Sequence, residues 1–335
     1  MTRGQDHRRR VLVTGGAGFI GSHLVELLAR DYSVRVVDNF STGRRENLAF
    51  LEHHPHVEIV EGDIADANGA KEWCQGVDTV FHLAVSCLRT SIRQPLASHD
   101  VNAGGTLHLC LAALDQNVRR FVYVSSSEVY GSAQVVPMRE DHPLEPITVY
   151  GAAKLAGELY ALACHRTYGL PVVIVRPFNT YGPREPWMGT RAEVILRFVL
   201  LFLQGRPPVI FGDGYQTRDF TFVTDTARGI LLASQCDLLV GQAVNIASGR
   251  ETRIRELVNQ IAVEMGGDTK FLNAASRPGD VRRHLADVSR ARNLLDFKPE
   301  FDLADGLRAT VAWFRQHQDD CLSDRVQAEA AAANW

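Results

Sequence analysis

A tyrosine and a lysine stand four residues apart in Tyr150-Gly-Ala-Ala-Lys154, a spacing that could support proton transfer. On a helix, residues at this spacing share a face, so the phenol and the ammonium would be neighbours. The lysine charge, together with a nearby nicotinamide cation, would lower the pKa of the phenol. A tyrosinate formed near neutral pH can act as a general base toward a hydroxyl group. The pair is frequent by chance, so its meaning depends on what surrounds it.

Hydroxyl and carboxyl groups precede this pair in Val124-Ser-Ser-Ser-Glu128, at the end of an expected strand. The hydroxyl of Ser126 or Ser127 could shuttle or orient the same proton. These serines could equally cap a turn or a helix. Glu128 is a candidate acid or base, and the alternative is a structural residue beside the site.

A glycine turn indicates which ligand these groups would meet. The run Val11-Leu-Val-Thr-Gly-Gly-Ala-Gly-Phe-Ile-Gly-Ser22 is an apolar strand, a tight turn with Gly15, Gly18 and Gly21, and then a helical pattern over 22–30. Backbone N–H groups in such a turn, with the helix N-terminus, attract a pyrophosphate. The turn therefore predicts a nucleotide site.

The second apolar run ends in Asp38, seventeen residues after Gly21. A carboxylate there can accept hydrogen bonds from both ribose hydroxyls and would repel a 2′-phosphate, which favours NAD over NADP. Arg44 and Arg45 lie close behind and could reach a 2′-phosphate. A plain turn residue is the structural alternative for Asp38.

Alternating strand and helix patterns must position these groups. We predict strands at 10–14, 33–38, 57–61, 79–83, 120–125 and 172–177, with helices that include 101–116 and 150–168. Such alternation predicts an α/β fold, a Rossmann-type doubly wound parallel sheet. Ligands bind beyond the carboxyl ends of its strands, where the polar motifs fall.

After Pro177 the elements become shorter, with helices expected at 193–204, 224–234 and 253–265. We predict an NAD-binding domain with the Tyr/Lys pair over 1–180 and a smaller, mainly substrate-binding C-terminal lobe over 181–320. Some segments of the lobe can return to the first domain. Residues 321–335 form a tail, whose alanine-rich part, 326–334, is expected to be a frayed helix or disordered.

The composition and net charge of the chain limit the kinds of partner that we expect it to bind. The chain has 335 residues, 45% hydrophobic content and a net charge of −3, which gives no reason to expect nucleic acid or an anionic membrane. No segment is apolar for long enough to span a bilayer. The six cysteines form no C-x-x-C pair and no metal-ligand spacing with histidine, so we expect reduced thiols, no metal site and a cytoplasmic protein.

From about residue 10 to 316 the chain resembles the extended short-chain dehydrogenase/reductase family, the NAD-dependent epimerases and dehydratases of nucleotide sugars. The resemblance rests on an ordered set of motifs. They are Thr14-Gly-Gly-Ala-Gly-Phe-Ile-Gly21, Asp63-Ile64, His82-Leu-Ala84, Asn102, Ser125-Ser-Ser127, Tyr150-x-x-x-Lys154, Arg176-Pro-Phe-Asn179, Tyr181-Gly-Pro-Arg184 and Gly212-Asp-Gly-x-Gln-x-Arg-Asp219.

The resemblance implies roles for residues at matching positions. The implied cofactor contacts are Gly15, Gly18, Phe19, Ile20, Gly21, Asp38, Asn39, Asp63, Ile64, Leu83, Ala84, Tyr150 and Lys154. The substrate would be a nucleotide-diphosphate sugar, and its implied or candidate contacts are Arg89, Asn179, Arg184, Arg191, Arg218 and Arg277. Guanidinium groups suit a diphosphate. The resemblance also suggests a homodimer built through the helices near 101–116 and 150–168.

The loop after Pro183 departs from the pattern of relatives and should lie near the sugar. Arg184 and Arg191 could recognise a carboxylate, as in a uronic acid, and Trp187 could stack on a sugar face. Alternatively, the loop is a lid with no role in specificity.

In the family, chemistry starts when the tyrosine, here Tyr150, removes a proton from the sugar 4-hydroxyl as hydride passes from C4 to NAD. We favour a 4-epimerase that acts on a UDP-sugar of the UDP-glucuronate or UDP-glucose type. Ser127-Glu128 keeps half of the Asp-Glu acid pair of relatives that dehydrate dTDP-glucose. A 4,6-dehydratase that uses Glu128 and a UDP-glucuronate decarboxylase therefore stay open. A non-catalytic NAD-binding regulator is the alternative from another class.

Overall fold

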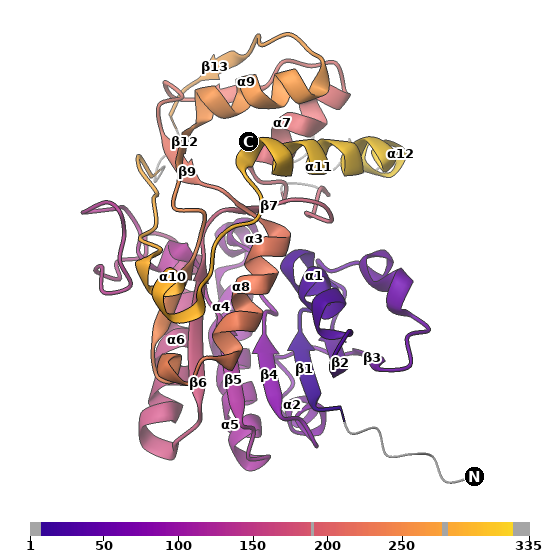
Figure 1. The fold of residues 1–335 in the computed structure, drawn as a ribbon, viewed down its shortest axis with the longest axis vertical. Coiled ribbons are helices and arrows are strands. Elements are labelled where there is room, and N and C mark those ends of the chain that lie inside the picture. Colours follow the sequence, from indigo (N-terminus) through magenta and orange to yellow (C-terminus); the bar gives the residue numbers. More distant parts are fainter. Residues whose placement is uncertain (1–7, 189–190, 277–280, 324–335) are drawn as a thin grey trace.

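The structure, a computed structural model, describes residues 8–188, 191–276 and 281–323. Its centre is a parallel sheet of seven strands in the order β11-β6-β5-β4-β1-β2-β3 (Figure 1). The strands are β1 (Arg10–Thr14), β2 (Ser33–Asp38), β3 (Val57–Glu61), β4 (Thr79–His82), β5 (Arg120–Val124), β6 (Val172–Pro177) and β11 (Ala243–Ile246). The Rossmann-type α/β fold is confirmed.

Alternate residues of each strand enter two separate cores, because successive side chains point to opposite faces of a sheet. Val11 and Val13 of β1 pack with α1 (Phe19–Leu28), α8 (Val223–Gln235) and α10 (Ser289–Leu295). Leu12, between them, packs on the opposite face. That face is covered by α2 (Ala67–Trp73), α5 (Thr106–Asp115) and α6 (Val149–Tyr168). Helices on both faces explain why the strands are almost continuously apolar.

Shorter helical segments complete this part of the chain. They are the 3-10 helices Arg45–Leu51, Ser127–Val129 and Asp237–Leu239, the helices α3 (Leu88–Arg93) and α4 (Pro95–His99), and the π-helix Asp100–Gly105. The helix predicted over 101–116 is therefore divided into this π-helix and α5. At the junction the Thr106 hydroxyl donates to the Asn102 carbonyl oxygen over 2.7 Å. The Asn102 side chain in turn bonds both backbone groups of Ser86.

Predicted strands agree with the structure to within one residue, since β4 and β5 each end one residue early. The first helix begins at Phe19 and not at Ser22, because Gly18 adopts the N-cap position immediately after the turn. Gly21 and Ser22 consequently lie inside the helix.

A second, smaller core lies over one end of the sheet (Figure 1). It contains α7 (Val194–Leu203), α9 (Ile254–Met265), α11 (Leu303–Gln316) and α12 (Gln318–Cys321). Three two-stranded sheets accompany them: β7 (Thr180–Tyr181) with β10 (Thr221–Phe222), β9 (Thr217–Asp219) with β12 (Glu251–Arg253), and β8 (Val209–Phe211) with β13 (Leu272–Ala274).

The chain crosses between the two parts more than once after residue 180. The helices α8 and α10 and the edge strand β11 pack with the large sheet, and β11 pairs with β6. Cys321, where the predicted tail begins, is buried in the smaller core. The alanine-rich segment 326–334 lies outside the described residues. Among the described helices, none combines the length and the apolar character that a membrane span requires.

Candidate active site

A cavity of about 960 Å³ lies between the carboxyl ends of the large sheet and the smaller core. Its wall includes the glycine turn residues Gly15, Gly18, Phe19, Ile20 and Gly21. Gly15 has a φ of +69°, and a Cβ there would lie 2.7 Å from the Cα of Ala84. Only glycine fits where the turn approaches the end of β4 this closely, so a backbone-lined cradle remains open to a ligand.

Asp38 ends β2 and also lines this cavity. Its carboxylate accepts hydrogen bonds from the backbone N–H groups of Ala17 (2.9 Å) and Phe40 (2.8 Å). Burial raises the pKa of Asp38, and these backbone bonds oppose that shift. The carboxylate is therefore fixed against the glycine turn, at the place predicted for a ribose contact.

Other predicted cofactor residues surround Asp38 and the end of β4. Asn39 donates from its side chain to Asp63 over 2.9 Å. Both line the cavity, together with Ile64, Leu83 and Ala84.

The two arginines that could reach a 2′-phosphate have other contacts. The guanidinium of Arg44 lies 4.2 Å from the centre of the Trp187 ring. That of Arg45 lies 4.0 Å from the Phe40 ring centre and pairs with Glu61.

Tyr150 and Lys154 lie on the first turns of α6, whose N-terminus is capped by the Thr148 hydroxyl accepting from the Gly151 N–H over 3.0 Å. The Lys154 ammonium donates to the Val124 carbonyl oxygen over 2.7 Å and lies 4.3 Å from the Tyr123 ring centre. Burial lowers the pKa of Lys154 to about 7, against an opposing effect of Glu158.

The predicted lowering of the Tyr150 pKa is wrong for the protein by itself. Burial raises the pKa of Tyr150, and the nearby Glu128 and Glu193 raise it further. A hydrogen bond with Ser126 acts in the opposite direction. The free protein therefore holds the phenol protonated at neutral pH.

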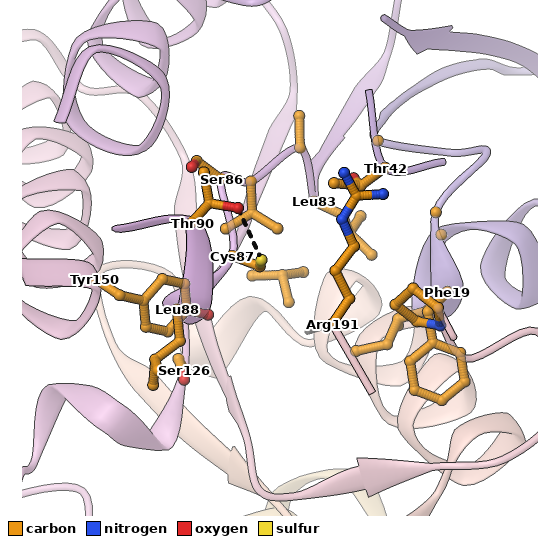
Figure 2. A pocket seen from close by; sticks show the side chains of 18 of the residues that line it. Phe19, Thr42, Leu83, Ser86, Cys87, Leu88, Thr90, Ser126, Tyr150 and Arg191 are labelled. Atoms are coloured by element: carbon orange, nitrogen blue, oxygen red, sulfur yellow. Dashed lines mark hydrogen bonds between the residues drawn. The ribbon is translucent and has the colours of Figure 1, made fainter. Parts of the chain in front are cut away.

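The serine turn meets the start of α6 at close range. A Cβ on Gly151 would lie 2.6 Å from the Glu128 carbonyl oxygen, so glycine permits this approach. Ser126 caps the 3-10 helix Ser127–Val129 by accepting from the Glu128 N–H over 3.2 Å. Ser126 therefore acts as a cap, which was one of the alternatives for the serines, and its hydroxyl also faces Tyr150 (Figure 2). Ser127 and Glu128 line the cavity beside it.

Three of the predicted substrate residues line the cavity: Arg89, Asn179 and Arg191. Arg89 pairs with Glu193 at 3.4 Å. The Asn179 amide oxygen lies 3.2 Å from a ring nitrogen of His284. Figure 2 shows Arg191 on the side of Phe19 and Thr42, away from Tyr150 and Ser126.

The structure places the remaining predicted residues elsewhere. Arg184 donates to Glu26 of α1 over 2.8 Å and is not part of the cavity wall. Arg218 donates to the carbonyl oxygens of Thr217 and Val281 and is also absent from that wall. Arg277 lies outside the described residues.

The predicted stacking of Trp187 on a sugar is wrong. Its side chain is 4% exposed and packs in the smaller core against Trp313 and Phe314. The indole thus contributes its apolar surface to the smaller core.

Sequence reasoning missed two carboxyl groups in the same loop. Glu185 and Glu193 both line the cavity, and the Glu185 carboxylate accepts from the Glu193 N–H over 3.1 Å. The sequence signals these two acids only by their position within the loop after Pro183. The arginines of that loop are the more evident candidates for substrate contacts.

Comparisons with known proteins identify the family of this chain. The family model described as GDP-mannose 4,6 dehydratase matches residues 12–310. The chain belongs to this family. The relatives that match this chain are nucleotide-sugar epimerases and dehydratases of the extended short-chain dehydrogenase/reductase class, so the resemblance is confirmed.

Relatives in this family differ in reaction. A putative UDP-glucose 4-epimerase of Methanocaldococcus jannaschii is 36% identical over 311 residues, covering 92% of this chain and 99% of the relative. The crystal structure of the dTDP-glucose 4,6-dehydratase DesIV of Streptomyces venezuelae, with NAD bound, has a TM-score of 0.86 and 37% identity, covering 92% of this chain and 98% of its own. The crystal structure of UDP-glucuronic acid 4-epimerase of Bacillus cereus, in complex with UDP-glucuronic acid and NAD, has a TM-score of 0.85 and 32% identity. The match covers 92% of this chain and 99% of that one.

Proposed function

We propose that this protein is an NAD-dependent nucleotide-sugar 4-epimerase that acts through a transient 4-keto intermediate, with a UDP-sugar as substrate. The observation that carries the proposal is the meeting of Tyr150, Lys154 and Ser126 at one wall of a cavity whose other side is the glycine turn. A hydride carrier and a proton acceptor can thus face one sugar carbon.

The residues present fit a dinucleotide. The Gly15 cradle leaves room for a pyrophosphate at the start of α1, and Asp38 stands where an adenosine ribose would lie. Bound NAD would supply a hydride acceptor that is restored within each turnover. The contacts of Arg44 and Arg45 with aromatic rings support NAD over NADP.

Once the positive charge of bound NAD favours its ionised form, Tyr150 would take the proton of the sugar 4-hydroxyl and would return it when the sugar is reduced on its other face. Lys154, held by the Val124 carbonyl oxygen, keeps a positive or protonatable group one helical turn away from Tyr150. Ser126 orients the phenol, since the two hydroxyls interact. Asn179 and Arg191 are proposed to contact the diphosphate part of the substrate.

A 4,6-dehydratase is the second candidate, because Glu128 lines the cavity close enough to Tyr150 to raise its pKa. A decarboxylase acting on UDP-glucuronate is the third. A non-catalytic NAD-binding regulator is disfavoured by the complete Tyr–Lys–Ser arrangement.

Mass measurement separates these reactions. The protein is incubated with UDP-, dTDP-, GDP- and ADP-sugars, including UDP-glucuronate, and the products are separated and weighed. A new isomer of unchanged mass is the expected result. Loss of water would identify a dehydratase and overturn the proposal, and loss of carbon dioxide would identify a decarboxylase. Glu128→Gln should leave epimerisation largely intact, whereas it should abolish a dehydration that depends on this acid.

A further inference from the structure

The loop that follows β7 brings two acidic side chains to the cavity wall, Glu185, which is buried, and Glu193, which is exposed. Glu185 is 2% exposed, and its Oε1 accepts from the Glu193 N–H. Its second oxygen, Oε2, is a buried atom without a hydrogen-bond partner among the described residues. The Glu193 carboxylate pairs with Arg89, whose Nε is likewise buried and unpartnered.

These groups act on one another and on the phenol. Burial and the nearby Glu193 raise the pKa of Glu185 to about 8, while Arg89 opposes the shift. Glu193 also raises the pKa of Tyr150, which places its charge near the reacting end of the cavity. A further anion brought to this end would meet like charge.

Among the described residues, most cations that could receive a substrate carboxylate at this wall are paired with an acid or lie elsewhere in the cavity. Arg89 is paired with Glu193, and Arg184 with Glu26 of α1. Arg191 lies on the side of Phe19 and Thr42 (Figure 2). Arg93 also lines the cavity, but its side chain is exposed to solvent, where its charge is screened.

Glu185 indicates what would fit at this wall instead. Its pKa of about 8 leaves it mainly protonated at neutral pH, because its buried position and the nearby Glu193 disfavour a negative charge. The carboxylate of a uronic acid at this wall would meet the same penalty, whereas the hydroxyl groups of a neutral sugar carry no charge.

We infer that the sugar site selects a neutral, hydroxyl-bearing hexose against a uronic acid, and that Glu193, with Arg89 and Glu185, determines this specificity. The inference rests on the proposed function. Rejection follows because Glu193 neutralises Arg89, so that this arginine offers no net positive charge to a substrate carboxylate.

The test compares UDP-glucose with UDP-glucuronate as substrates of the NAD-loaded protein, by chromatographic separation of each 4-epimer. We expect kcat/KM for UDP-glucose to exceed that for UDP-glucuronate by about tenfold or more. Glu193→Gln should release Arg89 and remove one charge, so this ratio should fall at least about threefold, mainly through a lower KM for UDP-glucuronate.

Glu26→Gln is the matched control, because it breaks the other arginine–carboxylate pair of the same loop without touching the cavity wall. It should leave the ratio unchanged. A wild-type preference for UDP-glucuronate would overturn the inference while the proposed epimerase stands. So would an unchanged ratio in Glu193→Gln, or a shift produced by Glu26→Gln. If no UDP-sugar of the panel is epimerised, the proposed function itself fails.

Discussion

Tyr150 illustrates how a single residue depends on its surroundings, because burial and two carboxylates keep its phenol protonated in the free protein. Tyr150→Phe removes the hydroxyl while retaining the ring. We expect the rate of 4-epimer formation to fall by about 10²- to 10⁴-fold, the usual contribution of a general base. NAD content and melting temperature should stay close to those of the wild type. Product formation by chromatography checks the rate, and unchanged activity would remove Tyr150 from the chemistry.

Glu185 makes stability depend on pH. Its folded-state pKa of about 8 lies above the ordinary value of 4.5, so folding favours the protonated acid. The cost of this group is therefore absent below about pH 4.5 and grows as pH rises through 8. We expect Glu185→Gln to be as stable as the wild type near pH 4.5 and more stable by about 2–4 kcal/mol at pH 9. Urea unfolding at both pH values measures the difference, and a constant difference would contradict it.

At the scale of elements, the loop after β7 is fastened to both parts of the molecule. His23 of α1 contacts the Pro183 carbonyl oxygen at 3.0 Å, and Arg184 pairs with Glu26 of the same helix. Trp187 inserts into the smaller core while Arg44, beside the glycine turn, covers its ring. The loop that bears the proposed specificity residues is thus held by packing and by charge.

Trp187→Phe tests whether this tryptophan serves packing or sugar binding. A smaller ring in the core should cost roughly 1–2 kcal/mol of unfolding free energy. The KM for the nucleotide sugar should change less than about twofold, since the indole does not line the cavity. Denaturant unfolding and steady-state kinetics give the two values. A large rise in KM without loss of stability would restore the stacking role.

For the whole molecule, we propose a homodimer through α5 and α6, as the resemblance suggested. Exposed apolar side chains occur on both helices, with Leu111 at 45%, Leu159 at 54% and Tyr160 at 39% exposure. Leu159→Glu should convert the dimer to a monomer, because a charge in an apolar interface is costly to desolvate. Light scattering after gel filtration reports the mass. A wild-type monomer, or a dimer that survives this change, would contradict the interface.

The sequence by itself determined six of the seven strands of the large sheet, all but β11, and predicted the residues on the cofactor side of the site. Valine-rich strands alternating with helices leave few other folds, and the glycine turn with Asp38 depends on contiguous residues and short spacings. The Tyr150–Lys154 pair could also be predicted from the sequence, because one helix carries both residues.

Only the tertiary structure decided which side chains of the loop after Pro183 line the cavity and which pack elsewhere. Its arginines and tryptophan suggested sugar contacts, yet Arg184 faces α1 and Trp187 faces the smaller core. Glu185 and Glu193 line the cavity together with Arg191. The same holds for the Tyr150 pKa, whose direction is set by burial and by carboxylates distant in sequence. An irregular loop has no periodicity to show which side of it is buried, so its orientation follows from long-range packing and charge pairing.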